Sequence, residues 1–303
     1  MLFLKGIKKL ATYINSTTKI FCFALCFTLW AMLTGILVST TSFAQSKNTS
    51  PTLRITFKAM LIKDGPPIVN GIEWRIFSTN IGEDGKFPLL AKSADSNSSF
   101  NMSPGVYMVH AAYGHASAIR KIEISKDDVS EPFIFNAGGL SLSAVAGENI
   151  PIPKSLLRFD IYEQKIDNRG NRRLIARSVL PNKIIPFPAG TYHVVSKFGM
   201  LNAEVRADLR VRAGKVTNGE LVHRAARITL RLVRETGSDA LANTRWSVFN
   251  ESGDLISEST SAFPNIVLSE GSYSAIAKND DTIYSLDFLV KAGLDQDVEV
   301  IAQ

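Results

Sequence analysis

The side chains that could perform acid–base or metal chemistry are few and widely spaced in this sequence. There are four histidines: His110, His115, His193 and His223. None stands at a metal-binding spacing, and a satisfied or solvated imidazole is expected at each position. Serine-hydrolase elbows, phosphate-binding loops and dinucleotide fingerprints do not occur. The sequence therefore predicts no catalytic residue, no metal site and no cofactor, and an enzyme would need a site assembled from unremarkable Ser, Asp and His residues.

Two acidic pairs and two tryptophans allow a ligand-binding interpretation beside a structural one. Asp127-Asp128 and Asp280-Asp281 could bind calcium, but no regular acidic loop repeats, so turn formation is favoured. Trp74 and Trp246 could stack on a sugar ring. Each of them begins an alternating strand, however, so burial in a core is expected.

Charge is distributed unevenly along the chain. The formal net charge is +6, but the first 44 residues contain four lysines and no acid, which leaves +2 for the remainder. Residues 45–138 are nearly balanced, with 10 basic and 9 acidic residues. Residues 139–226 hold 14 basic and 7 acidic residues, whereas residues 227–303 hold 6 and 12. The basic excess is thus concentrated in the middle of the chain.

Seven cations in this middle part are the candidate binding residues. They lie on a long polar turn and along one face of the stretch 206–212, and they are Lys165, Arg169, Arg172, Arg173, Arg206, Arg210 and Arg212. Such a cluster attracts polyanions such as acidic glycans or lipid headgroups in a salt-sensitive manner. Aromatic residues do not interleave these cations, so nucleic acid is not expected as a partner. The alternatives are that the charges complement the acidic segment that follows, or that they are simply solvated.

Three copies of one module must position these side chains. The stretch SPGVYMVHAAYG at 103–114 returns as PAGTYHVVSKFG at 188–199 and as SEGSYSAIAKND at 269–280. The first two copies align without gaps at a spacing of 85, so that Trp74 matches Phe159, and the third follows at 81 from Leu174 onward. The second and third copies differ in length at one polar turn, which is residues 163–173 in the second copy and 250–254 in the third. This is expected for an insertion into a hairpin.

Each copy shows short strands with period-two alternation. In the second copy, the apolar residues Val205, Ala207 and Leu209 alternate with charged ones, which indicates an antiparallel sheet with one solvated face. The Gly-x-Tyr motif in each copy predicts a tight turn at the glycine and a tyrosine that buries its ring and bonds nearby backbone. The closing Gly114, Gly199 and Asp280 predict a further turn, because glycine and aspartate tolerate positive φ.

These motifs resemble those of tandem prealbumin-like or immunoglobulin-like repeats. Each copy has the pattern apolar-x-apolar-x-x-Gly-x-Tyr, then a glycine turn and a strand, with Ala-Gly at 213–214 and 292–293. Such repeats form the regulatory domains of carboxypeptidases and the collagen-adhesin B-type modules of bacterial surface proteins. The resemblance implies a fold and carries little functional information. Adhesin modules often contain a Lys–Asn cross-link beside a buried acid; Lys58 and Asn136 are the candidates, but the strand at 107–113 holds no acid, so no cross-link is expected.

The first 44 residues have the layout of a secretory signal peptide. Lysines precede an apolar run from Ile20 to Val38, and Ser42-Phe43-Ala44 places small residues at −3 and −1 of a cut before Gln45. If it is not cleaved, the run could span a bilayer as an anchor. Both cysteines lie within the run, so the mature chain would have no thiol and no disulfide.

The predicted fold class is all-β, with three tandem antiparallel β-sandwich modules after the N-terminal segment. The predicted ranges are 1–44 for the signal peptide or anchor, 45–51 for a flexible lead-in, 52–138 for module 1, 139–226 for module 2 and 227–303 for module 3. The predicted function is that of an exported, non-enzymatic binding or structural protein of the cell envelope, in the periplasm or at the cell surface. An inner-membrane-anchored scaffold for envelope proteins is the alternative if the segment is not cleaved.

Overall fold

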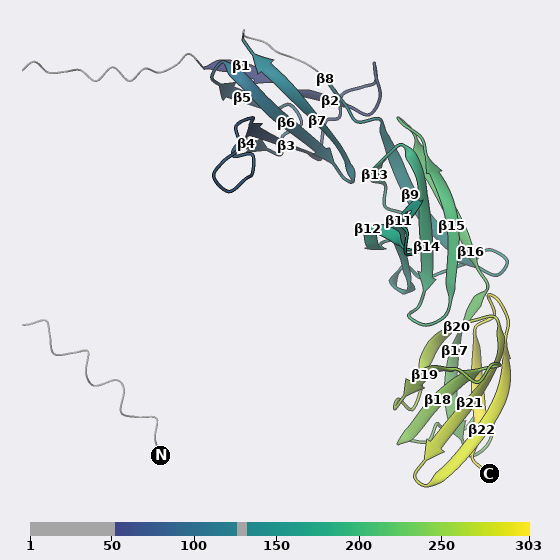
Figure 1. Cartoon of the computed structure of the whole chain (residues 1–303). Helices are drawn as coiled ribbons and strands as arrows, with labels where there is room; N and C mark the ends of the chain where they lie inside the picture. Colours follow the sequence, from purple (N-terminus) through teal and green to yellow (C-terminus); the bar gives the residue numbers. More distant parts are fainter. Residues whose placement is uncertain (1–51, 126–131) are drawn as a thin grey trace, which may run out of the picture. The chain divides into compact units, whose positions relative to one another are not determined.

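The computed structural model describes residues 52–125 and 132–303, which fold almost entirely into β-strands. The helical element within these ranges is a single 3-10 turn, η1 (Lys154–Leu156). Figure 1 shows the strands in three successive groups along the chain. Each group contains a four-stranded antiparallel sheet and a second layer made of the remaining strands. The chain is thus all-β and built of β-sandwich modules, as predicted.

Module 1 contains the strands β1 to β8. Its four-stranded sheet has the order β4-β3-β6-β7, while β1 pairs with β5 and β2 pairs with β8 in the second layer. The bounds are β1 (Leu53–Thr56), β2 (Lys58–Met60), β3 (Ile72–Ser78), β4 (Leu89–Ser93), β5 (Ser99–Met102), β6 (Gly105–Tyr113), β7 (Ala116–Ile124) and β8 (Pro132–Ile134).

Module 2 contains the strands β9 to β16. Its four-stranded sheet has the order β12-β11-β14-β15, and β9 pairs with β10, β13 and β16 in the second layer. The bounds are β9 (Ala137–Ala146), β10 (Ile150–Pro151), β11 (Leu157–Ile166), β12 (Arg172–Val179), β13 (Ile185–Pro188), β14 (Gly190–Phe198), β15 (Glu204–Val211) and β16 (Val216–His223).

Module 3 contains the strands β17 to β23. Its four-stranded sheet has the order β19-β18-β21-β22, and the second layer has the order β20-β17-β23. The bounds are β17 (Ala225–Val233), β18 (Thr244–Asn250), β19 (Leu255–Ser259), β20 (Asn265–Ser269), β21 (Gly271–Asn279), β22 (Thr282–Val290) and β23 (Gln296–Ile301).

The second layer of every module contains one parallel pair that the alternation pattern did not predict. These pairs join a strand near the start of the module to its last strand: β2 with β8, β9 with β16, and β17 with β23. Period-two alternation specifies which side chains are buried but is the same for both strand directions. The direction of this pairing therefore emerges from the structure alone.

Equivalent aromatic residues lie at the centre of the three cores. Trp74 is 0% exposed, Phe159 is 0% exposed and Trp246 is 2% exposed. In module 1 the ring of Phe57 stacks on Trp74 with centroids 5.3 Å apart. The prediction that both tryptophans are core residues is confirmed, and stacking of a sugar on either is excluded by their burial.

The Gly-x-Tyr motif makes the same contact in each module. The tyrosine hydroxyl donates to the backbone carbonyl four residues earlier, from Tyr107 to Ser103 at 2.8 Å, from Tyr192 to Pro188 at 2.8 Å and from Tyr273 to Ser269 at 2.9 Å. The turns after the strand also follow the prediction, because Gly114, Gly199 and Asp280 have φ values of 59°, 73° and 50°. The repeated sequence thus encodes a repeated strand entry and exit.

Several other predictions can be compared with the described residues. Lys58 and Asn136 are both exposed, and Lys58 pairs with Pro132, so the structure gives no support to a cross-link. Residues 1–51 and Asp127-Asp128 lie outside the described residues. Between residues 52 and 125 and between 132 and 303, no helix is long and apolar enough to cross a membrane.

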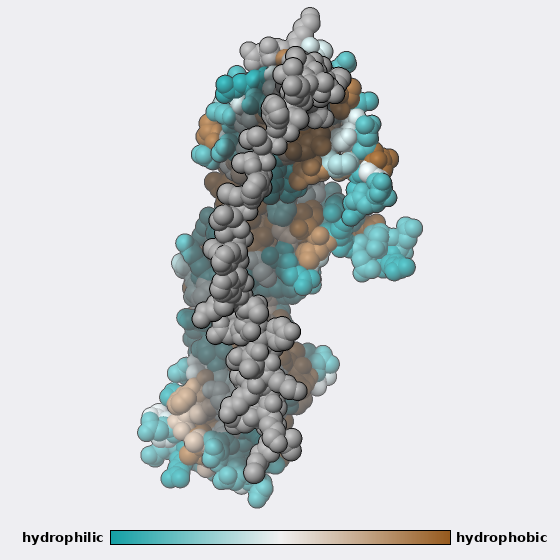
Figure 2. All heavy atoms as spheres, turned by 90° about the vertical axis from the view of Figure 1, so that its left-hand side faces the viewer, coloured by the Kyte–Doolittle hydropathy of each residue, from teal (hydrophilic) through white to brown (hydrophobic). Residues whose placement is uncertain are grey.

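Figure 2 shows a mainly hydrophilic face on which hydrophobic residues form separate groups.

Candidate interaction surface

The outward face of the four-stranded sheet of module 2 carries most of its candidate binding residues. Strands β11, β14 and β15 lie side by side, and their registers align outward residues in rows: Arg158–Lys197–Glu204, Asp160–Val195–Arg206 and Tyr162–His193–Asp208. These residues alternate with inward apolar ones such as Phe159 and Ile161. The period-two pattern of each strand therefore creates a charged surface above a buried core.

The seven predicted cations fall into two groups at opposite edges of this sheet. Lys165, Arg169, Arg172 and Arg173 lie on the β11–β12 hairpin, whereas Arg206, Arg210 and Arg212 lie on or just after β15. Arg172 and Arg206 nevertheless line the same shallow depression of about 430 Å³, together with Tyr162, His193 and Lys197. The sequence predicted one cluster, and the structure shows two groups with a basic depression between them.

Some of these cations are already neutralised by the protein. Arg173 forms an ion pair with Glu163, and Arg206 forms one with Glu204 at 2.8 Å. Arg172 donates to the backbone carbonyl of Gln164. Among the described residues, Lys165, Arg169, Arg210 and Arg212 have no ion-pair partner, and all four are exposed. These four are the cations that remain available to an external anion.

The tip of the β11–β12 hairpin has a defined conformation that presents Arg169. The carboxylate of Asp167 accepts the backbone N–H groups of Arg169 at 2.9 Å and Asn171 at 2.8 Å. Gly170 completes the turn with a φ of 81°. Aspartate at the start of a turn commonly fixes it in this way. The long insertion of module 2 is therefore an ordered hairpin end.

An ion pair between a buried carboxylate and a partly exposed lysine on the same face was not predicted from the sequence. The Asp160 side chain is 7% exposed, and its Oδ2 lies 2.9 Å from Nζ of Lys197. Its Oδ1 accepts the backbone N–H of Ser178 at 2.8 Å. Burial alone would raise the pKa of Asp160, but the bonds from Ser178 and Lys197 and the charge of Arg177 lower it overall. Asp160 is therefore an ionised carboxylate held inside the surface.

This ion pair lies in a depression of about 640 Å³. Its lining includes Arg158, Tyr162 and Arg177 from β11 and β12, besides Asp160 and Lys197. Ser178 at its edge has a φ of 53°, which is unusual for a residue other than glycine. In the sequence Asp160 has the pattern of an ordinary outward residue of an alternating strand, so no local signal distinguishes it.

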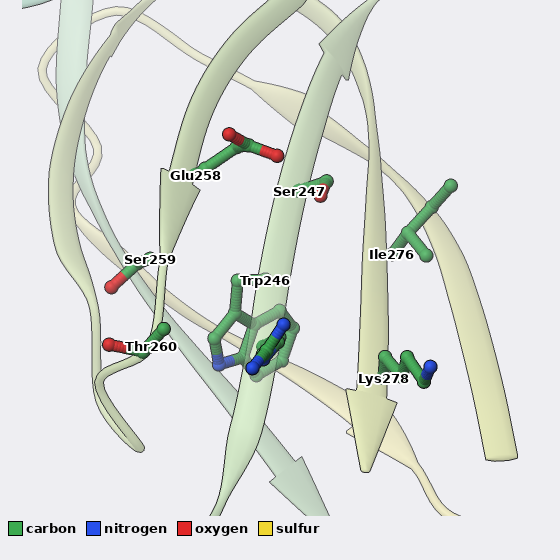
Figure 3. A pocket seen from close by; sticks show the side chains of 8 residues that line it. Trp246, Ser247, Glu258, Ser259, Thr260, Ile276 and Lys278 are labelled. Atoms are coloured by element: carbon green, nitrogen blue, oxygen red, sulfur yellow. The ribbon is translucent and has the colours of Figure 1, made fainter. Parts of the chain in front are cut away.

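Module 3 has a depression at the equivalent place on its own sheet. Figure 3 shows side chains from three neighbouring strands around it, with Ser259 and Thr260 on one side of β18 and Lys278 and Ile276 on the other. Its volume is about 630 Å³, and its lining residues are Arg245, Trp246, Ser247, Glu258, Ser259, Thr260, Ile276 and Lys278.

The histidines do not converge. His193 Nδ1 lies 2.7 Å from Oδ1 of Asp208, and burial is the main cause that lowers the pKa of His110 and of His115. His223 is 1% exposed, and its Nε2 lies 2.7 Å from Oγ of Ser196. Its Nδ1 has no hydrogen-bond partner among the described residues, which departs from the prediction of a satisfied or solvated imidazole. Across 52–125 and 132–303, no group of three His, Cys, Asp or Glu is placed to hold a metal.

Comparison with known proteins supports the repeat organisation. Residues 227–302 match the family model of the Rhizobiales growth-associated tandem repeat domain. No curated protein matches the chain. The match covers the third of the repeated modules, each of which folds as a β-sandwich.

The solved structures to which the chain is similar are distant in sequence. The Bacillus anthracis TIE protein is 13% identical, with 84% of this chain and 50% of that chain covered and a TM-score of 0.24. A streptococcal ancillary pilin is 10% identical, with 83% and 99% covered and a TM-score of 0.32. The minor pilin of Streptococcus agalactiae is 13% identical, with 56% and 95% covered and a TM-score of 0.31. The chain spans half the length of the first of these proteins.

Proposed function

We propose that this chain is an exported, non-enzymatic protein with a structural or adhesive role in the cell envelope. The observation that supports this proposal most is the contrast between its faces. Each module has a closed apolar core, and in modules 2 and 3 the outward face of the four-stranded sheet carries charged residues and shallow depressions. Such surfaces are suited to recognition over an area, because they lack the deep apolar pocket of most small-molecule sites.

Export rests on the signal-like layout of residues 1–44. Removal of this segment before Gln45 would leave the three modules in the periplasm or at the cell surface. Retention would anchor them at the inner membrane, where they could act as a scaffold for partner proteins. N-terminal sequencing of the protein recovered from the envelope is expected to begin at Gln45, and a sequence that begins at residue 1 would support the anchored alternative.

The proposed contact surface for acidic glycans or lipid headgroups is the basic part of module 2. Its four unpaired cations lie on the β11–β12 hairpin and at the end of β15, on either side of β14, with Arg172 and Lys197 in the depression between them. A polyanion that crosses the strands could therefore contact both groups of cations at once. The Arg173–Glu163 and Arg206–Glu204 pairs would contribute less, because their charges are already compensated.

Reversal of the module 2 charges is expected to abolish retention on an immobilised polyanion. The test passes purified residues 45–303 over heparin in a salt gradient, beside a variant with Arg169, Arg172, Arg173, Arg210 and Arg212 changed to Glu. The wild type is expected to elute with rising salt, because salt screens charge attraction, and the variant is expected to flow through.

A matched control variant distinguishes binding by the module 2 surface from a general effect of the net charge of the protein. In it, Arg54, Lys58, Lys63, Lys86 and Lys92 of module 1 are changed to Glu, since these five cations are also exposed. Retention of this control like the wild type would locate binding in module 2. Equal loss in both variants would show a response to net charge only and would contradict the proposed surface.

A hydrolase is the least supported function. The pair of Ser196 and His223 has the atoms of a nucleophile and its base, but the two residues are 0% and 1% exposed, so a substrate has no access to them. No labelling of the purified protein by an activity-based serine-hydrolase probe is expected. Labelling that disappears in Ser196→Ala would overturn this assignment.

A further inference from the structure

Modules 2 and 3 share a pair of cations that module 1 lacks. Arg158 lies directly opposite Lys197 in module 2, and Arg245 lies directly opposite Lys278 in module 3. The same register position in module 1 holds Glu73 opposite Ala112. Like charges directly opposite each other destabilise a sheet unless an anion lies near them. The repeated pair therefore points to an anion at this position.

Module 2 supplies that anion from its own chain. Asp160 lies two residues after Arg158 on the same face of β11, and its carboxylate is bonded to Lys197 at 2.9 Å. This bond is the first cause of the raised pKa of Lys197, so the ammonium group stays charged. Arg158 is held at the edge of the depression by the backbone carbonyls of Lys154 and Leu157. The carboxylate thus compensates the charge of Lys197, while Arg158 is bonded by backbone carbonyls.

Module 3 keeps the cations but lacks the carboxylate. Ser247 takes the place of Asp160, two residues after Arg245 on β18. Arg245 and Lys278 are both exposed, and neither has an ion-pair partner within the described residues. Glu258 also lines the depression and lies opposite Ser247, but it is not within ion-pair distance of either cation. The cations are therefore available to an external anion.

We propose that the depression of module 3 binds the carboxylate of an acidic sugar residue between Arg245 and Lys278. The ligand carboxylate takes the position that Asp160 occupies in module 2. The hydroxyls of Ser247 and Thr260 and the carboxylate of Glu258 can bond sugar hydroxyls, and Ile276 offers an apolar contact for the ring. This mixture of cations, hydroxyls, one acceptor carboxylate and one apolar side chain matches a uronic acid better than a bare anion.

The acidic character of module 3 restricts the ligand further. Its 6 basic and 12 acidic residues repel a densely charged polyanion at long range. A single carboxylate on an otherwise neutral glycan avoids this repulsion and still reaches the two cations. The inference deepens the proposed envelope function, but its site, ligand and test differ from those of the module 2 surface. Either can therefore fail without the other.

The experiment is a titration of purified residues 45–303 followed by backbone amide NMR shifts of Ser247, Ile276 and Lys278. The probe is methyl α-D-galacturonoside, and its neutral methyl ester is the matched control ligand. Saturable shifts with the acid and none with the ester are expected. Arg245→Gln and Lys278→Gln are each expected to weaken binding about tenfold, because each removes a charge-assisted hydrogen bond. Lys291→Gln, which removes an exposed cation outside the depression, should leave binding unchanged.

A substitution that copies the module 2 residue into module 3 tests the role of the carboxylate directly. Ser247→Asp is expected to abolish binding, because the chain then supplies its own carboxylate, whereas Ser247→Asn has the same size without the charge and should bind. Equal shifts with the acid and the ester, or unchanged binding in Ser247→Asp, would overturn the proposal. Tighter binding of N-acetyl-aspartyl amide than of the sugar would overturn the sugar assignment in favour of a peptide.

Discussion

Replacement of Gly138 by alanine is expected to destabilise module 2 by about 3 kcal/mol. Gly138 lies in β9, between β13 and the turn that joins β15 to β16. A Cβ atom at this position would lie 2.1 Å from the backbone oxygen of Arg212 and 2.6 Å from that of Lys215. Both obstacles are backbone atoms, so no side-chain rotation can relieve the overlap.

The turn cannot move away without the loss of hydrogen bonds. The N–H of Gly139 donates to Lys215 O at 2.9 Å, and the N–H of Gly214 donates to Ala137 O at 2.8 Å. A shift of β9 would in turn disturb its pairing with β13 and β16. The expected cost therefore combines steric overlap with broken strand pairing.

The matched control for this prediction is Gly190→Ala in the same module. Gly190 lies in β14, and its added Cβ would meet nothing closer than 3.8 Å. Its expected effect is close to zero or slightly stabilising. The stability of module 2 in both variants is measured by hydrogen exchange of β14 peptides. Tryptophan fluorescence would follow the other two modules, which contain Trp74 and Trp246, because module 2 has no tryptophan. Equal protection in the two alanine variants would contradict the account of Gly138.

Mild acid is expected to destabilise module 2 through His223. Burial lowers the pKa of His223 from 6.5 to about 4. Between these values the unfolded chain binds a proton that the folded chain does not, so stability falls as the pH drops from 6.5 towards 4. Below about 4 both states are protonated and the loss stops. The total expected loss is about 3 kcal/mol.

The contacts of His223 explain why its neutral form is favoured. Its ring packs edge-on against Phe198 with centroids 5.9 Å apart, and Ser196 provides its one side-chain hydrogen bond. Because Nδ1 has no partner among the described residues, a proton added there would be buried without an acceptor. The position equivalent to Ser196 is Ala111 in module 1 and Ala277 in module 3, so this polar pair is specific to module 2.

The measurement compares the wild type with the double variant Ser196→Ala/His223→Leu across pH 7 to 4. Hydrogen exchange of β14 and β16 peptides is expected to show a steeper loss of protection with acid in the wild type. Removal of both polar partners should cost little at pH 7. Carboxylates titrate in both proteins, so the difference between their slopes of protection against pH gives the contribution of His223 alone. Parallel slopes would show that His223 does not couple to stability.

The fold was predictable because all three copies show the same period-two alternation and the same Gly-x-Tyr motif. Alternation located the strands, and the Gly-x-Tyr motif located a tyrosine contact that the structure shows in every module. The glycine of this motif is the first residue of a strand in each module, and the predicted tight turn at it is not a shared feature, because Gly190 has no positive φ. The parallel pairing of β9 with β16 could not be predicted, because side-chain alternation is the same in parallel and antiparallel strands.

The candidate surface was only partly predictable. Exposed cations such as Arg169 and Arg210 follow from local sequence, but the separation of the seven cations between two sheet edges depends on strand order. The pairing of Asp160 with Lys197 depends on the register of β11 against β14, which joins residues 37 positions apart. The repeats themselves align Ser247 with Asp160, but the strand pairing that places these positions beside Lys278 and Lys197 comes from the structure.

Co-sedimentation with isolated cell envelopes tests the central claim most directly. Purified residues 45–303 would be mixed with envelopes of the organism that produces the protein, beside the five-fold Glu variant of module 2 and the five-fold Glu control of module 1. The proposed function predicts that the wild type and the control sediment with the envelopes and are released by salt, while the module 2 variant stays in the supernatant. Failure of the wild type to sediment, or equal sedimentation of the module 2 variant, would contradict it.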